Sequence, residues 1–119
     1  MRLSPIPLAA RPHTVAIAPC VALDAHHAPA FGPDTAFPRV KVQFIASYDG
    51  GVDAPVKQTG VCYIDGQDAP ASPWDMQRDS LAAGHPARLT WQGAAFLIDA
   101  VTPVHQPDGT VHHWKVTFR

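Results

Sequence analysis

Proline is the residue that most constrains how this chain can fold. Thirteen prolines are spread along its 119 residues, and a proline inside a helix removes a backbone hydrogen bond and clashes with the preceding turn. Glutamate is absent and lysine occurs only three times, so the residues that usually cover exposed helix faces are scarce. The composition therefore predicts short strands joined by turns of proline, glycine and aspartate.

The length and charge of the chain fit one small domain, which we place at residues 1–119. The formal net charge is −1, without a basic or acidic block. The charge of the chain therefore gives no reason to expect a nucleic acid or an anionic membrane as a partner. No run of about 18 apolar residues occurs, so a membrane-spanning helix is not expected. We expect Cys20 and Cys62 to be free, packed thiols.

The N-terminal half predicts two strands and two long loops. Residues 1–13 are punctuated by proline and should form an extended arm, followed by a strand at 13–18. Residues 20–37 contain several turn-forming residues and are interpreted as a loop. A regular strand over residues 39–48 follows, and a second loop over 49–58. The apolar face of that strand is formed by Val40, Val42, Phe44, Ala46 and Tyr48.

The C-terminal half predicts one short helix and four strands. Ser72 suits an N-cap, Pro73 the first helical position and Gly84 the helix end. The strands are expected at residues 60–65, 88–91, 94–101 and 111–118, with a Gln92-Gly93 turn between the second and the third. The whole pattern predicts a mainly β protein, a small β-barrel or sandwich of about five to seven short strands with long loops and at most one short helix.

The adjacent pair His112-His113 is the feature most suggestive of chemistry. Successive side chains of a strand point to opposite faces, so the two imidazoles should be separated and unable to bind one ion. A metal site needs convergent ligands, and we assign no metal ligand here. On the inward face, beside His112, lie the residues that we expect in the core of this closing strand: Trp114, Val116 and Phe118.

The usual signatures of catalysis are missing from the sequence. No serine lies in a Gly-x-Ser-x-Gly setting, no cysteine follows a helix-start or basic signal, and no glycine-rich phosphate loop occurs. All ten acidic residues are aspartates, mostly in contexts where aspartate forms turns. We therefore expect no enzyme activity, no catalytic residue and no cofactor.

Short motifs in both halves of the chain resemble one family of phage proteins. The C-terminal motifs are Ala83-Gly84-His85, Arg88-Leu89-Thr90-Trp91, Gln92-Gly93, residues 96–101, Pro103 and residues 111–116. The N-terminal motifs are Pro5-Ile6-Pro7, Pro12-His13-Thr14-Val15, Phe31-Gly32 and Arg39-Val40-Lys41-Val42. Taken together, these motifs resemble those of the head-completion proteins of tailed phages, which are the head-closure or stopper components of the head–tail connector. The chain departs from that family at His85 and Lys115, where the family usually has an acid.

The resemblance implies a structural protein of the virion. Such proteins are small β-barrels that form a homo-oligomeric ring, of about six or twelve subunits, below the phage portal or its adaptor. The ring closes the DNA-filled head and is the platform for tail attachment. The implied partners are the portal or adaptor above, tail proteins below and packaged DNA at most through the channel, with no membrane. The implied location is the head–tail interface, after assembly in the host cytoplasm.

In this interpretation one loop of each subunit closes the channel. The segment 49–58 is the candidate, because it follows a strong strand and its glycines permit a change of conformation. The residues assigned to the channel loop or to subunit interaction are Asp49, Gly50, Gly51, Val52, Asp53 and Lys57. The arm 1–13 and the loop 20–37 are candidates for contacts with neighbouring subunits.

Three other functions stay open. A tail-completion or tail-terminator ring would also be small, β-rich and oligomeric. A small barrel enzyme of the cupin type would take metal ligands from His26, His27 and His112 or His113, although the usual His-x-His spacing is missing. A ligand- or carbohydrate-binding module would use an aromatic face made of three tryptophans: Trp74, Trp91 and Trp114.

Overall fold

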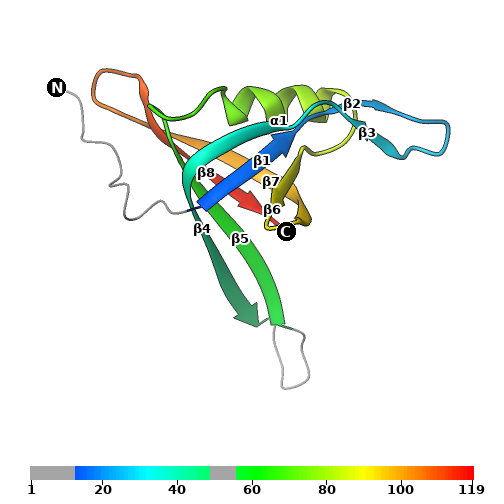
Figure 1. The fold of residues 1–119 in the computed structure, drawn as a ribbon, viewed down its shortest axis with the longest axis horizontal. Coiled ribbons are helices and arrows are strands. Elements are labelled where there is room, and N and C mark those ends of the chain that lie inside the picture. Colours follow the sequence, from blue (N-terminus) through cyan, green and yellow to red (C-terminus); the bar gives the residue numbers. More distant parts are fainter. Residues whose placement is uncertain (1–12, 49–55) are drawn as a thin grey trace.

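The strands of the chain form a closed six-stranded antiparallel barrel (Figure 1). The computed structural model describes residues 13–48 and 56–119. The order around the barrel is β1-β4-β5-β8-β7-β6. These strands are β1 (His13–Ala18), β4 (Thr35–Tyr48), β5 (Val56–Asp65), β6 (Arg88–Trp91), β7 (Ala94–His105) and β8 (Val111–Phe118). A two-stranded sheet, β2 (Cys20–Leu23) and β3 (Pro29–Phe31), and a helix, α1 (Pro73–Ala82), complete the fold. The predicted mainly β barrel with one short helix is confirmed.

Several predicted elements lie where the sequence indicated. Gln92 and Gly93 both adopt positive φ, 50° and 79°, the combination that a two-residue hairpin turn of the primed type requires. β7 is longer than expected and continues through Pro103 to His105. Proline is tolerated there because the short β6 pairs only with residues 94–97, so the other side of β7 is a free edge at Pro103 among the described residues.

The segment 20–37 is not the long loop that the sequence predicted. It contains β2 and β3, and β4 begins within it at Thr35. The turn between β2 and β3 is closed by Asp24, whose Oδ1 accepts hydrogen bonds from the backbone N–H groups of His26 (2.7 Å) and Ala28 (2.9 Å). The turn-forming residues therefore build a hairpin, and its strands of three and four residues are too short to show an alternating pattern.

A bulge in β4 lies where this strand changes its partner, from β1 up to Val40 to β5 from Lys41. Arg39 has a φ of 56°, and the register with β1 shifts in the same region, so that Val15 pairs with Phe37 but His13 with Val40. Phe37 and Val40 are consequently both fully buried although three positions separate them. After the bulge, β4 pairs with β5 from Lys41 onwards.

The core is apolar and fills the inside of the barrel. Val116 and Phe118 are fully buried, while Trp114 is half-buried and packs against the same cluster. Gly60 makes room for Phe118, because a Cβ at this glycine would lie 2.2 Å from the phenyl ring. The other members of the cluster are Val15, Ile17, Phe37, Val40, Val42, Cys62, Ile64, Ala87, Leu89 and Ile98.

Helix α1 begins and ends at the predicted signals. The Ser72 Oγ accepts the N–H of Asp75 at 3.3 Å, and Gly84 has the positive φ of a residue that follows a helix, 106°. Buried polar side chains attach the helix to the barrel. Gln77 donates to the Ile98 carbonyl (3.0 Å) and accepts from the Ala87 N–H (2.9 Å). In the part of the chain that the structure describes, no helix has the length and apolar character needed to cross a membrane.

Candidate functional site

A two-stranded ribbon projects from the barrel and is the first candidate site (Figure 1). Residues 41–48 of β4 pair with residues 56–63 of β5, whereas β5 pairs with β8 only from Gly60 onwards. Among the described residues, the outer part of this β4–β5 ribbon therefore has no third strand beside it. Its two strands lead directly into and out of residues 49–55.

Of the predicted channel-loop residues, Lys57 is the one that the structure describes. Asp49, Gly50, Gly51, Val52 and Asp53 lie outside the described residues. Lys57 is in β5, opposite Ser47. The expected loop 49–58 is thus too long at its C-terminal end, because β5 already begins at Val56. The pairing of β4 with β5 continues to Tyr48, so residues 56–58 of β5 have strand partners.

An aromatic cluster fixes the base of the ribbon. The Phe44 ring lies 5.6 Å from Trp91, 5.9 Å from Phe96 and 5.8 Å from Phe118, centroid to centroid. Phe44 also stands opposite Gly60 in the register, so the space left by the glycine is taken by Phe118 and the cluster closes over it. Ring contacts at these distances stabilise one orientation of the ribbon. The alternation of residues 40–48 predicted Phe44 on the apolar face of its strand, but its aromatic partners could not be predicted.

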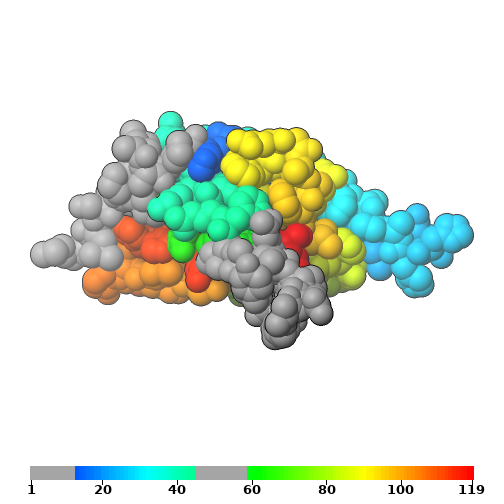
Figure 2. Space-filling model, turned by 90° about the horizontal axis from the view of Figure 1, so that it is seen from below, coloured from blue at the N-terminus to red at the C-terminus, as the bar shows by residue number. Residues whose placement is uncertain are grey.

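A second projection is the β2–β3 arm, defined here as residues 20–31. It extends away from the barrel in two perpendicular views (Figures 1 and 2), and Val21 is 60% exposed. Its base is held firmly, since the Cys20 N–H donates to the Ser80 Oγ of α1 at 2.8 Å and the Arg88 guanidinium lies 4.7 Å from the Phe31 ring centroid. A two-stranded ribbon alone is marginally stable in water, so these contacts determine the direction of the arm.

The histidine pair in β8 does not divide between two faces as predicted. His113 pairs with Val104 and Val111 with His105, so His112 is an extra residue in a β-bulge. The bulge brings the two imidazoles together, with 2.8 Å between their Nδ1 atoms. The prediction from simple alternation is wrong because the partner strand imposes the bulge.

The surroundings of His113 disfavour the positively charged form of its imidazole. Burial, and then the neighbouring His112, lower the pKa of His113, while Asp65 acts in the opposite direction. Asp65 is fully buried and pairs with His113 across the β5–β8 ladder. No group of three or more His, Cys or Asp side chains within the described ranges could hold a metal ion. His26 and His27 lie elsewhere, in the exposed turn of the β2–β3 arm.

The three tryptophans do not form a single face. Trp74, on α1, and Trp114, on β8, line one groove of about 280 Å³. Trp74 also lines a second groove of about 340 Å³, against β7. Trp91 packs instead in the aromatic cluster, with the His13 ring at 5.4 Å. The aromatic surface open to a ligand is therefore centred on Trp74, which is 43% exposed.

Both cysteines are free and buried, as the sequence predicted. Cys62 lies in β5 between β4 and β8, paired with Val42 on one side and Val116 on the other. Burial raises the pKa of its thiol to about 12. Such a thiol is protonated at neutral pH and is a poor nucleophile, so Cys62 belongs to the core.

Comparison of the sequence with protein-family models and with curated proteins finds no match. The fold of the chain is therefore the basis for inferring its function. Its most distinctive parts are two projections from a closed barrel, the β4–β5 ribbon and the β2–β3 arm.

Proposed function

We propose that the protein is a structural subunit of a phage head–tail connector, which forms a ring below the portal or its adaptor, closes the DNA-filled head and provides the platform for the tail. The observation that carries the proposal is the β4–β5 ribbon, which leaves the barrel without a third strand in the described part of the chain. Its role would be to hold residues 49–55 at a distance from the barrel, toward the axis of the ring.

The two projections suit a ring built from identical copies. A heterologous contact, in which one surface of a subunit meets a different surface of the next, generates a closed ring when the rotation closes. The β2–β3 arm is stiffened at its base by Cys20 and Phe31, and its outer half is exposed. Such an arm suits contact with a neighbouring subunit, while the ribbon remains available to the channel.

The charge of the chain also supports a channel component. The formal net charge of −1 gives DNA phosphates no overall attraction, and phosphate contacts from Lys and Arg are what make proteins adhere to DNA without regard to sequence. A ring with this charge would let packaged DNA pass. The ribbon tips would stop it by meeting one another sterically or through pairing of strand edges.

The test is assembly on the proposed partner. The full chain, co-expressed with portal and adaptor proteins from the genome that encodes it, should form rings on the portal complex that are visible by negative-stain electron microscopy. Native mass spectrometry should then give a fixed number of copies per portal. Particles that carry the chain only on tail-tube ends would support a tail-completion ring instead. Absence from portal and tail complexes alike would refute a connector role.

A matched variant tests the role of the ribbon. Replacing residues 49–55 by an equally long Gly-Ser segment keeps both strands and should leave ring formation intact. Heads that carry the variant ring should lose packaged DNA, which nuclease protection measures. A variant that retains DNA as well as the wild type would show that this segment does not close the channel.

A further inference from the structure

Trp74 forms the centre of an apolar surface on α1 and β7 that the proposed function does not explain. It is the second residue of the helix and 43% exposed, and Leu81 on the same helix is 53% exposed. Trp74 lines two grooves, and the Arg78 guanidinium lies 5.3 Å from the centroid of its ring. The groove against β7 is lined by Trp74, Gln77, Arg78, Leu81, Asp99, Ala100 and Val101. The other is lined by Ser72, Trp74, Pro103, His105, Val111 and Trp114. We call these two grooves together the Trp74 face.

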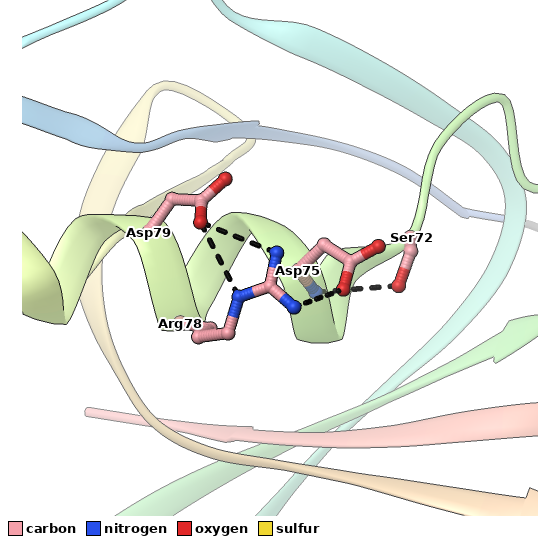
Figure 3. Close-up of polar contacts among 4 residues, drawn as sticks. All are labelled: Ser72, Asp75, Arg78 and Asp79. Carbon is pink, nitrogen blue, oxygen red and sulfur yellow. Dashed lines mark hydrogen bonds and ion pairs between the residues drawn. The ribbon is translucent and has the colours of Figure 1, made fainter.

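The residues that line the Trp74 face include one arginine, Arg78, and one aspartate, Asp99, and two further aspartates of α1 lie next to Arg78. Arg78 lies between two carboxylates of its own helix, with Nη1 3.1 Å from Asp75 and Nε 3.3 Å from Asp79 (Figure 3). On β7, Asp99 is paired with Arg119 at 3.0 Å. Three aspartates thus face two arginines. The last turn of α1 also lacks a basic residue, and the C-terminal end of a helix favours a positive charge nearby.

The N-terminal segment of the chain has the complementary composition. Residues 1–12, MRLSPIPLAARP, contain three prolines, apolar side chains, two arginines and no acid. Proline-rich segments adopt a polyproline II conformation at little entropic cost, and aromatic-lined grooves bind them. Twelve residues in that conformation span about 37 Å at about 3.1 Å per residue, enough to cover both grooves.

β1 fixes the position from which the N-terminal segment starts. The C-terminal end of β1 lies beside α1, since Cys20, two residues after Ala18, donates to Ser80 of the helix at 2.8 Å. His13, at the other end of β1, lies about 17 Å further along the strand at about 3.3 Å per residue. The segment that precedes β1 therefore starts about one strand length from the contact between Cys20 and Ser80.

We propose that residues 1–12 of one subunit bind the Trp74 face of a neighbouring copy as a proline-rich extended segment. The arginines would meet the aspartates of α1, while a proline or an apolar side chain would enter each groove. The proposal rests on the ring assembly proposed above and identifies one contact that would hold it together.

The first experiment uses a peptide and the full-length chain. A variant with Leu3→Ser, Ile6→Ser and Leu8→Ser has a weakened segment and leaves the face vacant for a synthetic peptide of residues 1–12. In NMR spectra the indole N–H signals of Trp74 and Trp114 should shift with saturation, while that of Trp91 stays in place. Adding Trp74→Ala should weaken binding about thirtyfold, as expected for the central aromatic residue of an interface.

A matched control is Leu97→Ser, which alters a 39%-exposed apolar residue in a different groove. This change should leave the affinity for the peptide within about twofold, as expected for a residue outside the contact. Absence of saturable shifts up to about 1 mM peptide, a range that would detect even weak binding, would overturn the proposal. Equal weakening by the Leu97 and Trp74 substitutions would do so as well.

The second experiment tests whether the segment binds the Trp74 face of a neighbouring subunit or that of its own subunit. The segment variant and a Trp74→Ser variant should each sediment as monomers, because each lacks one half of the contact. Mixed together they retain one intact segment and one intact face, so a 1:1 dimer should appear in sedimentation velocity. Peptide binding without this dimer would mean that the segment covers its own face, which would refute the second-copy occupant. Peptide binding and dimer formation without rings on a portal would refute the proposed function and leave this contact standing.

Discussion

At the scale of the residue, one inserted position in β8 changes the environment of two side chains. With 2.8 Å between the Nδ1 atoms of His112 and His113, one nitrogen must donate and the other accept, so the contact requires at least one neutral imidazole. Protonation of both rings would place two positive charges side by side at the margin of the core. Burial and the neighbouring ring outweigh Asp65, and the pKa of His113 is lowered.

The lowered pKa predicts a loss of stability in acid. Between the folded and unfolded pKa values of His113 the unfolded chain binds more protons, so the free energy of unfolding decreases as the pH falls below about 6.5, the unfolded value. Urea denaturation at pH 7.5 and pH 5.0 measures this loss. His113→Gln should reduce the loss, whereas His27→Gln, in the exposed turn of the β2–β3 arm, should not. An unchanged loss in the His113 variant would contradict this account.

At the scale of the element, α1 is held by hydrogen bonds more than by apolar contacts. Its buried residues are Pro73, Gln77 and Ser80. Ser80 accepts the Cys20 N–H at 2.8 Å and donates to the His85 carbonyl at 2.6 Å, and Gln77 connects β7 to the segment before β6. These bonds satisfy backbone groups that the barrel strands leave unpaired, so the helix and the barrel stabilise each other.

Substitution of Gln77 should therefore affect the whole fold. Gln77→Ala leaves the Ile98 carbonyl and the Ala87 N–H without partners, at about 1–3 kcal/mol for each buried group, so we expect a loss of about 2–6 kcal/mol in unfolding free energy. Arg78→Ala is the control on the next residue, because its ion pairs are exposed and such pairs contribute under about 1 kcal/mol. Urea denaturation followed by circular dichroism compares the two. Similar losses in both variants would refute the bridging role of Gln77.

The elements that could be predicted are those whose signals are local. The Gln92-Gly93 turn, the Ser72 cap and the alternation of residues 115–118 in β8 each depend on residues close together in the chain. The His112 bulge could not be predicted, because the pairing of β8 with β7 determines it. The role of Gln77 was equally hidden, since its partners lie 10 and 21 residues away. The candidate sites show the same difference between features with local signals and features that depend on distant partners. The ribbon follows from strand patterns, but the Trp74 face exists only when α1, β7 and β8 are placed together.

At the scale of the whole molecule, closure of the barrel protects its interior. Cys62 lies in the middle of β5, fully buried between two neighbouring strands, and a reagent reaches its sulfur only when those strands separate. Because the barrel is a closed ring of six strands, such separation breaks the ladder that every other strand depends on. Exposure of Cys62 should thus report the opening of the entire domain.

Thiol labelling measures that opening. In a Cys20→Ser variant, which leaves Cys62 as the only thiol, reaction with an aromatic disulfide reagent at pH 8 should be limited by unfolding and should accelerate with urea in parallel with the loss of circular dichroism. The raised pKa, about 12, slows the reaction of any folded molecule further. Fast, urea-independent labelling would show that the barrel opens locally around β5.

The β4–β5 ribbon has a further consequence for how such a chain can vary. Side chains alternate along a strand with a period of two, so adding two residues to each arm of the ribbon preserves which face every later residue occupies. Each such step lengthens the ribbon by about 6.6 Å at about 3.3 Å per residue. The outer part of the ribbon pairs with no other strand among the described residues, so no barrel contact restricts these steps. Ribbon length and barrel stability are therefore separately adjustable, and variants of this chain with a longer or shorter ribbon should keep the same barrel.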